Sequence, residues 1–321
     1  MDYTISDLYV LWMKKREKQS NDGIIDIKTV KRDEQHWRKY YVGNKLVTIP
    51  IRKITTKMLN DFLNDSIVAF KLSRKEFNNM KTILNAVFQL AIDKELISIN
   101  PLINVHTDVK FRSIQKKKDG SRLYLDKEKE RLEKFLYQKA TIQAYAILID
   151  FQIGTRIGEL VVLEKDDMLN GEAYIHKMEI VDEEIVDGVY KRKGYKVVEY
   201  VKHDISSGYR TIPLSKKARE ILEEILKINP DSKYLFTLED GKRMTSRSFN
   251  YWLEKYCKEA GVPFKSSHCI RRTFASRLFA EGMSLEELSV YMGHEDTDTT
   301  KGYIYNYNEI EKNRAYMDKA L

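Results

Sequence analysis

The chain has 321 residues, a hydrophobic fraction of 42% and a formal net charge of +8 at pH 7. This length favours two domains, and the apolar content excludes an intrinsically disordered chain. We find neither an apolar run of about 18 residues, which could span a bilayer, nor a secretion signal. Two cysteines exclude a disulfide framework and are typical of a protein from a reducing cytoplasm.

The basic residues are concentrated in the first third of the chain. Residues 1–120 carry 23 Lys and Arg against 14 Asp and Glu, whereas the remaining residues carry 33 against 34. Such a positive region is typical of a surface that binds a polyanion such as DNA. A solvated lysine-rich surface would give the same counts, so charge alone leaves both interpretations open.

Residues 1–105 are predicted to form a small helical unit with basic faces. The last of its helices has the clearest signals, because Ser73 and Glu76 make a capping box and apolar residues follow at spacings of three and four. Pro101 stops helical structure after it. The patterns predict four helices, over residues 4–19, 28–41, 55–70 and 74–93.

Residues 106–122 are interpreted as a basic linker. A turn is expected at Asp119-Gly120. The segment could be a flexible hinge with solvated charges, or a strap over a phosphate backbone, where each contact releases counterions and makes binding sensitive to salt. Its candidate DNA-binding residues are Lys110, Arg112, Lys116, Lys117, Lys118 and Arg122.

Residues 123–321 are predicted to be an α+β domain. A helix near 126–138 is followed by an apolar stretch and then by a region rich in Val, Ile and Tyr, which we expect to form an extended hairpin over about 172–210. Turns are expected at Asp187-Gly188, Lys193-Gly194 and Ser207-Gly208. The chain after Pro213 is predicted to be helical. The fold class is therefore mainly α with a small antiparallel β-sheet.

Two pairs of polar residues in this domain lie one helical turn apart. Arg156 precedes Glu159 by three residues, so the carboxylate can brace the guanidinium. His268 and Arg271 have the same spacing near a helix start, where backbone N–H groups favour an anion. Either pair alone could be an ordinary structural feature. Arg272 is expected to point to another side of the helix and to be structural.

Two arginines suit the transfer of a phosphodiester. Planar guanidiniums can grip the non-bridging oxygens and stabilise the charge that builds up there. They can thereby replace a metal, and the sequence has no His, Cys or carboxylate cluster with metal-ligand spacing. A tyrosine could attack once a histidine takes its proton, leaving a covalent phosphotyrosine that needs no nucleotide for religation. We therefore expect no cofactor.

The nucleophile and the acid are harder to choose from residue types. Twenty tyrosines are present, and Tyr303, Tyr305 and Tyr307 cluster after Gly293-His294. At least two of these three must have ordinary packing roles. Lys202 could protonate the departing sugar oxygen if its hairpin reaches the site.

In the order of these clusters the chain resembles the tyrosine recombinase (phage integrase) family over nearly its whole length. Residues 154–160 look like the first arginine box and residues 268–275 like the second. Residues 207–214 look like the strand after the catalytic-lysine hairpin. Gly293-His294 with Thr299-Thr300 looks like the third box, in which the family's nucleophile lies nine residues after the histidine. That spacing selects Tyr303.

The resemblance implies a role for each matching residue. Tyr303 would attack and give a 3′-phosphotyrosyl link with a free 5′ hydroxyl. Lys202 would be the general acid, but the hairpin before Arg210 looks a residue or two longer than usual, so Lys196 stays open. For the others, it implies that Arg156 and Arg271 bind the scissile phosphate, that His268 and His294 assist proton transfer or phosphate binding, and that Glu159 supports the site.

The resemblance also implies an architecture and partners. Residues 1–105 would be a helical core-DNA-binding domain, and residues 123–321 a catalytic domain that ends in a tail helix over about 304–321. The two domains would clamp double-stranded DNA, as a monomer when free and a homotetramer on DNA, with possible accessory DNA-bending or excisionase proteins and no membrane. The enlarged hairpin is similar to that of integrases of conjugative transposons. The resemblance starts directly at the core-binding helices and includes no counterpart of the family's N-terminal arm-binding domain, so the chain is expected to be naturally short or trimmed.

The function implied is that of a site-specific DNA recombinase of a mobile element, acting without metal or ATP in a bacterial cytoplasm, on the nucleoid. Two alternatives remain. One is a DNA-binding accessory protein that has lost activity. The other is a relaxing enzyme of the type IB topoisomerase kind, which shares the chemistry.

Overall fold

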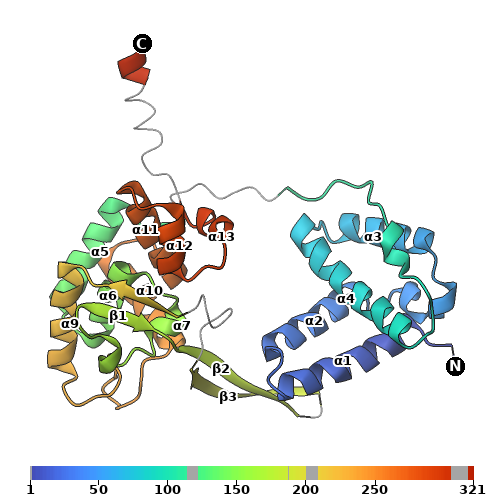
Figure 1. Cartoon of the computed structure of the whole chain (residues 1–321), viewed down its shortest axis with the longest axis horizontal. Coiled ribbons are helices and arrows are strands. Elements are labelled where there is room, and N and C mark those ends of the chain that lie inside the picture. Colours follow the sequence, from blue (N-terminus) through green and yellow to red (C-terminus); the bar gives the residue numbers. More distant parts are fainter. Residues whose placement is uncertain (1, 114–121, 187, 200–208, 305–316) are drawn as a thin grey trace. The chain divides into compact units, whose positions relative to one another are not determined.

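The computed structural model describes all residues except 1, 114–121, 187, 200–208 and 305–316 (Figure 1). The chain packs as two compact units. The first comprises Met1–Lys116 with Glu183–Lys193, and the second comprises Lys117–Asp182 with Gly194–Leu321. No described helix is long and apolar enough to cross a membrane. The predicted fold class, mainly helical with a small antiparallel sheet, is confirmed.

The first unit contains the four predicted helices, which surround an aromatic core. The capping box of the last helix is present, because Ser73 Oγ accepts from Glu76 N and the Glu76 carboxylate accepts from Ser73 N. Tyr9 stacks on Trp37 with ring centroids 3.8 Å apart. The helices are α1 Ile5–Asn21, α2 Ile27–Tyr40, α3 Thr56–Ala69 and α4 Arg74–Asp93, with 3-10 turns at Lys45–Thr48, Ile51–Lys53 and Pro101–Asn104.

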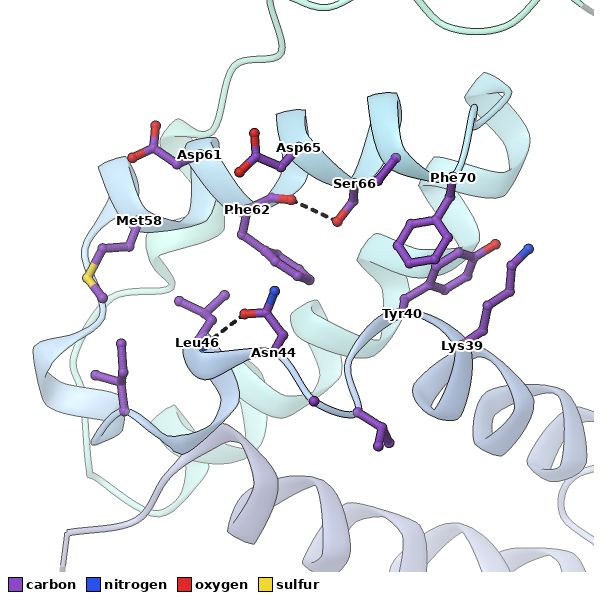
Figure 2. Close-up of a pocket in the computed structure, with 14 residues that line it drawn as sticks. Lys39, Tyr40, Asn44, Leu46, Met58, Asp61, Phe62, Asp65, Ser66 and Phe70 are labelled. Atoms are coloured by element: carbon purple, nitrogen blue, oxygen red, sulfur yellow. Dashed lines mark hydrogen bonds between the residues drawn. The ribbon is translucent and has the colours of Figure 1, made fainter.

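An open hollow of about 590 Å³ lies in the first unit, on the side formed by α3 and the segment after α2 (Figure 2). Phe62 and Leu46 contribute apolar lining, and Asp61 and Asp65 contribute acidic groups. Its acidic groups are not suited to phosphates, and none of the predicted catalytic residues lines it. It is therefore not a candidate for the site of strand cleavage.

Strands β2 Met178–Val186 and β3 Val189–Val198 pair as a hairpin whose tip belongs to the first unit. There Ile185 is buried in the aromatic core, and the Lys31 ammonium lies 5.2 Å from the Tyr190 ring centroid. The turn predicted at Lys193-Gly194 is wrong, since β3 runs through it and Gly194 takes a φ of 143° that favours glycine. Ser207-Gly208 lies outside the described residues.

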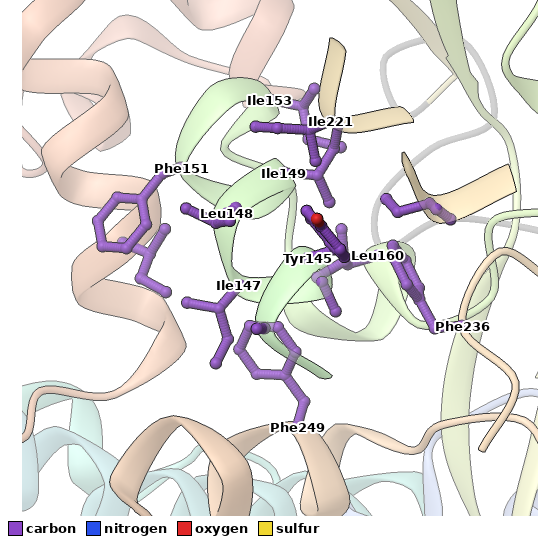
Figure 3. Packing of buried hydrophobic residues seen from close by; sticks show 14 of the residues in the cluster. Tyr145, Ile147, Leu148, Ile149, Phe151, Ile153, Leu160, Ile221, Phe236 and Phe249 are labelled. Atoms are coloured by element: carbon purple, nitrogen blue, oxygen red, sulfur yellow. The ribbon is translucent and has the colours of Figure 1, made fainter. Parts of the chain in front are cut away.

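The second unit is built around α6 Ile142–Ile153, which is buried on all sides (Figure 3). A helix that is apolar all round must be covered by neighbours, and Ile221 and Phe249 are among the residues that pack with it (Figure 3). Strands β1 Glu172–Ile175 and β4 Arg210–Pro213 pair in antiparallel register. The other helices are α5 Asp126–Lys139, α7 Ile157–Leu160, α9 Lys216–Ile228, α10 Ser246–Ala260, α11 Ser267–Ala280, α12 Leu285–Met292 and α13 Thr297–Lys301, and a 3-10 turn spans Lys165–Asp167.

Candidate active site

The predicted catalytic residues that the structure describes come together at the ends of four helices of the second unit. Arg156 caps α7, directly after α6 ends at Gly154. Gly154 has a φ of 58°, and a Cβ there would come within 2.2 Å of the Phe274 ring on α11. Only glycine therefore lets α11, which carries His268 and Arg271, pack directly against the turn that precedes Arg156.

A buried Glu159 carboxylate holds two guanidiniums in place. Its Oε1 accepts from Arg156 Nη1 at 2.9 Å, and its Oε2 accepts from Arg210 Nη2 at 2.6 Å. The Glu159 side chain is 0% exposed. Burial raises the pKa of Glu159, but Arg210 and Arg156 outweigh that effect and lower it to about 2. Glu159 is therefore ionised, and its hydrogen bond with Arg156 Nη1 fixes the orientation of that guanidinium.

Arg210 is a site residue for which the sequence motifs predict no role. It is buried at the start of β4, and its Nε donates to Tyr291 O at 2.8 Å. One signal could have found it: strand alternation places Arg210 on the same face as Ile212, which is also buried. A buried arginine needs a carboxylate partner. Glu159 is a buried carboxylate in the first arginine box, which precedes Arg210 in the chain.

Arg271 is 1% exposed and links the C-terminal ends of two helices, α6 and α12. Its Nη1 donates to Gly154 O at 2.9 Å, and its Nη2 donates to Met292 O and, at 3.2 Å, to His294 Nε2. Burial lowers the pKa of Arg271 to about 9, so the guanidinium remains charged at neutral pH. The side chain thus joins the ends of α6 and α12 to the middle of the site.

The hydrogen bonds of His294 define its tautomer. Because an arginine can only donate, Nε2 must be the acceptor toward Arg271. The Nδ1–H then donates to Thr300 Oγ1 at 2.9 Å. Burial, followed by Arg271 and Arg156, lowers the pKa of His294 to about 3. His294 is therefore neutral in the folded protein.

The pKa of His294 predicts an acid-sensitive fold. The unfolded chain binds a proton at this residue below about pH 6.5 and the folded chain does not, so stability present above that pH is lost as the pH falls. We expect a loss on the order of 1 kcal/mol per pH unit from this group. Chemical denaturation at about pH 7 and about pH 5 measures it. The loss should shrink in His294→Gln and persist in the control His106→Gln, which changes an exposed histidine; equal losses in both variants would contradict the assignment.

The Tyr303 ring lies among two histidines and two guanidiniums. Its centroid is 4.9 Å from the His268 ring and 4.8 Å from the His294 ring. The guanidinium carbons of Arg271 and Arg272 lie 5.7 and 5.1 Å from it. The expectation that Arg272 points away from the site is therefore wrong. The two guanidiniums favour the negative charge that a phosphate would bring.

His268 lies in the first turn of α11, beside Tyr303, and remains open to solvent. Partial burial, followed by Arg272, Arg271 and Arg156, lowers the pKa of His268 to about 4. Solvent screens these charges, so we expect a smaller effect on stability than for His294. A neutral imidazole next to the phenol is able to accept its proton.

Several predicted residues are not part of this cluster. Lys202, Lys116, Lys117 and Lys118 lie outside the described residues, as do Tyr305, Tyr307 and most of the predicted tail helix. Lys196 is on β3, where it forms an ion pair with Asp182 at 3.1 Å. In the linker, Arg112 pairs with Glu76 at 3.0 Å, Lys110 is exposed and Arg122 is half-buried. Among the described residues, no group of three or more His, Cys, Asp or Glu side chains could hold a metal ion.

The fold and the site define a class of protein that a family comparison identifies. The family model described as the phage integrase family matches residues 122–309, which is more than half of the chain. The chain therefore belongs to the phage integrase family, and it is a tyrosine recombinase.

Individual relatives agree with this assignment. The chain is similar to the prophage ps2 probable integrase of Lactococcus lactis subsp. lactis (strain IL1403), at 27% identity over 275 residues, or 81% of this chain and 69% of that protein. Its fold is similar to that of the Tn1549 transposon integrase in complex with transposon right end DNA, with a TM-score of 0.65, 24% identity and coverage of 98% and 99% of the two chains. It is also similar to a lambda integrase tetramer bound to a Holliday junction, with a TM-score of 0.59, 17% identity and coverage of 92% and 76%.

Proposed function

We propose that this recombinase breaks and rejoins DNA at specific sites through Tyr303, and that its substrates are the ends of a mobile element. The observation that carries the proposal is the placement of the Tyr303 ring within 5 Å of the His268 and His294 rings, beside the Arg271 guanidinium. Relatives named as a prophage integrase and a transposon integrase support the mobile element as substrate.

The proposed reaction is a transesterification, in which one phosphate ester replaces another and no ester is hydrolysed. The Tyr303 oxygen attacks the scissile phosphorus, and its proton passes to His268, whose ring centroid lies 4.9 Å from that of Tyr303. The bond from phosphorus to the 5′ oxygen breaks, which leaves a 3′-phosphotyrosyl link. Arg156 and Arg271 stabilise the charge on the non-bridging oxygens. Reversal by a second strand's 5′ hydroxyl rejoins the DNA.

We assign the proton of the leaving 5′ oxygen to Lys202. The alternative, Lys196, is engaged by Asp182 on the neighbouring strand, whereas Lys202 precedes β4, whose first residue Arg210 binds Glu159 inside the site. Lys202→Ala should cleave ordinary DNA about a hundredfold more slowly. A substrate with sulfur in place of the leaving 5′ oxygen needs no proton and should restore the rate. Lys196→Ala is the matched control, and a sulfur rescue of that variant alone would reverse the assignment.

We propose that residues 1–105 and 123–321 act as a core-binding and a catalytic domain that hold double-stranded DNA between them. The solved tetramer of lambda integrase on a Holliday junction supports assembly into a homotetramer on DNA. Accessory DNA-bending or excisionase proteins would then set the direction of recombination. A tail helix over about 304–321 would join neighbouring protomers.

We propose that the linker over 106–122 contacts the phosphate backbone. Residues 106–113 belong to the first unit, where Arg112 N donates to Leu72 O at 2.9 Å and the Arg74 guanidinium lies 4.0 Å from the Phe111 ring centroid. Lys110 is exposed beside this contact. Replacing Lys116, Lys117 and Lys118 by Gln should reduce the slope of log K against log salt by about 2–3 units in DNA-binding titrations. An unchanged slope would favour the solvated hinge.

One experiment separates the three candidate functions. Sites are first selected by binding from random duplexes, and the protein is then given a duplex that carries such a site with a nick beside it, in EDTA and without nucleotide. A covalent complex that survives denaturant supports the recombinase, whereas binding without a complex would support an inactive accessory protein. Relaxation of a plasmid that lacks the site would support a topoisomerase-like enzyme.

A further inference from the structure

A buried carboxyl lies behind Arg271 on a helix that is otherwise apolar along its buried length. Asp150 is 0% exposed in the last turn of α6, and its backbone carbonyl accepts from Gly154 N at 2.8 Å. An aliphatic side chain would fit this environment without the cost of burying a polar group. The presence of an aspartate there therefore calls for a partner.

Three buried polar groups at this place lack hydrogen-bond partners among the described residues. They are the two carboxyl oxygens of Asp150, the hydroxyl of Thr155 and the Nε of Arg271. Burial raises the pKa of Asp150 well above its usual value, and the Arg271 guanidinium and the Thr155 hydroxyl act in the opposite direction, as expected of donors that lie next to the carboxyl. Two donors and one acceptor are thus close together, although none of them makes a hydrogen bond of normal geometry with a described residue.

The donors of Arg271 show what such a bond would do. A guanidinium has five N–H groups. Three of them already point to Gly154 O, Met292 O and His294 Nε2, which leaves the Nε–H and one hydrogen on Nη1. If a buried acceptor binds the Nε–H, the last hydrogen, on Nη1, has a fixed direction and is available to the phosphate. Preorganisation of this kind is what makes a charged group effective in a transition state.

We propose that Asp150 is a positioning residue for Arg271: its carboxyl, assisted by the Thr155 hydroxyl, accepts the Nε–H and fixes the plane in which the guanidinium meets the scissile phosphate. The catalytic consequence rests on the proposed function, but the hydrogen bond itself does not. Asp150→Asn keeps a carbonyl oxygen as acceptor and Asp150→Leu removes it at similar volume. The pair therefore separates hydrogen bonding from core filling.

The bond can be tested without DNA. In protein labelled with ¹⁵N-arginine, the Nε–H resonance of Arg271 is assigned by its loss in Arg271→Lys. We expect slow hydrogen exchange at this group in the wild type and in Asp150→Asn, and exchange faster by about tenfold or more in Asp150→Leu. Equal protection in Asp150→Leu would overturn the proposal, whether or not the protein proves to cleave DNA.

The cleavage assay tests the consequence. Asp150→Leu should slow covalent-complex formation on the nicked duplex by about tenfold or more, with DNA affinity within about twofold of the wild type. Asp150→Asn should stay within about threefold of the wild type. A purely structural residue would behave differently, because leucine would then serve as well as or better than asparagine. Ile149→Val, a change at the neighbouring buried position, is the control for packing. Wild-type rates in Asp150→Leu, or equal losses in both Asp150 variants, would contradict the proposed role.

Discussion

Replacing Tyr303 by phenylalanine should abolish covalent capture of DNA while leaving DNA binding intact. The ring contacts of Tyr303 with His268 and His294 need no hydroxyl, so the variant should fold and keep its packing. The nucleophilic oxygen is lost altogether, and we expect complex formation to fall by on the order of 10⁴-fold or more. The measurement is the rate of covalent-complex formation on the nicked duplex, with affinity measured in parallel.

Two neighbouring tyrosines provide matched controls. Tyr305→Phe and Tyr307→Phe make the same chemical change two and four residues further along the chain. Both variants should still form the complex at rates close to that of the wild type. A complex formed by Tyr303→Phe, or one lost in either control alone, would show that the nucleophile is another tyrosine.

Removal of the Glu159 carboxylate should have the largest effect on stability. Glu159→Leu leaves Arg156 and Arg210 without their shared anion, and breaking a buried pair of this kind costs about 3–5 kcal/mol. Cleavage should also slow by about a hundredfold or more, because Arg156 loses the group that orients it. Denaturation and single-turnover cleavage of the folded fraction measure the two losses separately.

A second buried ion pair serves as the matched control. Glu179 binds Arg243 at 2.8 Å in the same unit and its side chain is also buried, but its carboxylate pairs with Arg243 and with Ser246 N instead of with a proposed catalytic group. Glu179→Leu should destabilise the protein by a similar amount and leave the cleavage rate of folded molecules within about threefold. In addition, Arg210→Met should restore part of the stability of Glu159→Leu without restoring its rate. If Glu179→Leu slowed cleavage as much as Glu159→Leu, Glu159 would have no special role.

The parts of the site that could be predicted from sequence are those in which local spacing decides the geometry. Arg156 and Glu159 lie one turn apart, and their pairing follows from that spacing. The end of α6 at Gly154 is also set by local backbone geometry, as is the capping box at Ser73 outside the site. The choice of Tyr303 relied on the resemblance, because no local rule separates it from its neighbours.

The parts that were missed depend on contacts between distant segments. Arg210 enters the site because β4 pairs with β1, which lies far earlier in the chain. The prediction for Arg272 is wrong because helix spacing gives its direction on α11, but the segment after α13 decides where Tyr303 lies. The glycine at position 194 predicts a turn, but the hairpin turns at Gly188 and β3 continues through Gly194. Tertiary pairing therefore overrides turn propensity there.

The most direct test of the central claim is to identify the residue that carries the DNA. The covalent complex would be treated with nuclease and trypsin, and the peptide of residues 302–312, which contains Tyr303, Tyr305 and Tyr307, would be sequenced by mass spectrometry. We predict a nucleotide joined through its 3′ phosphate to Tyr303. A nucleotide on Tyr305, on Tyr307 or on any other residue, or a link through a 5′ phosphate, would contradict the assignment of Tyr303 as the nucleophile.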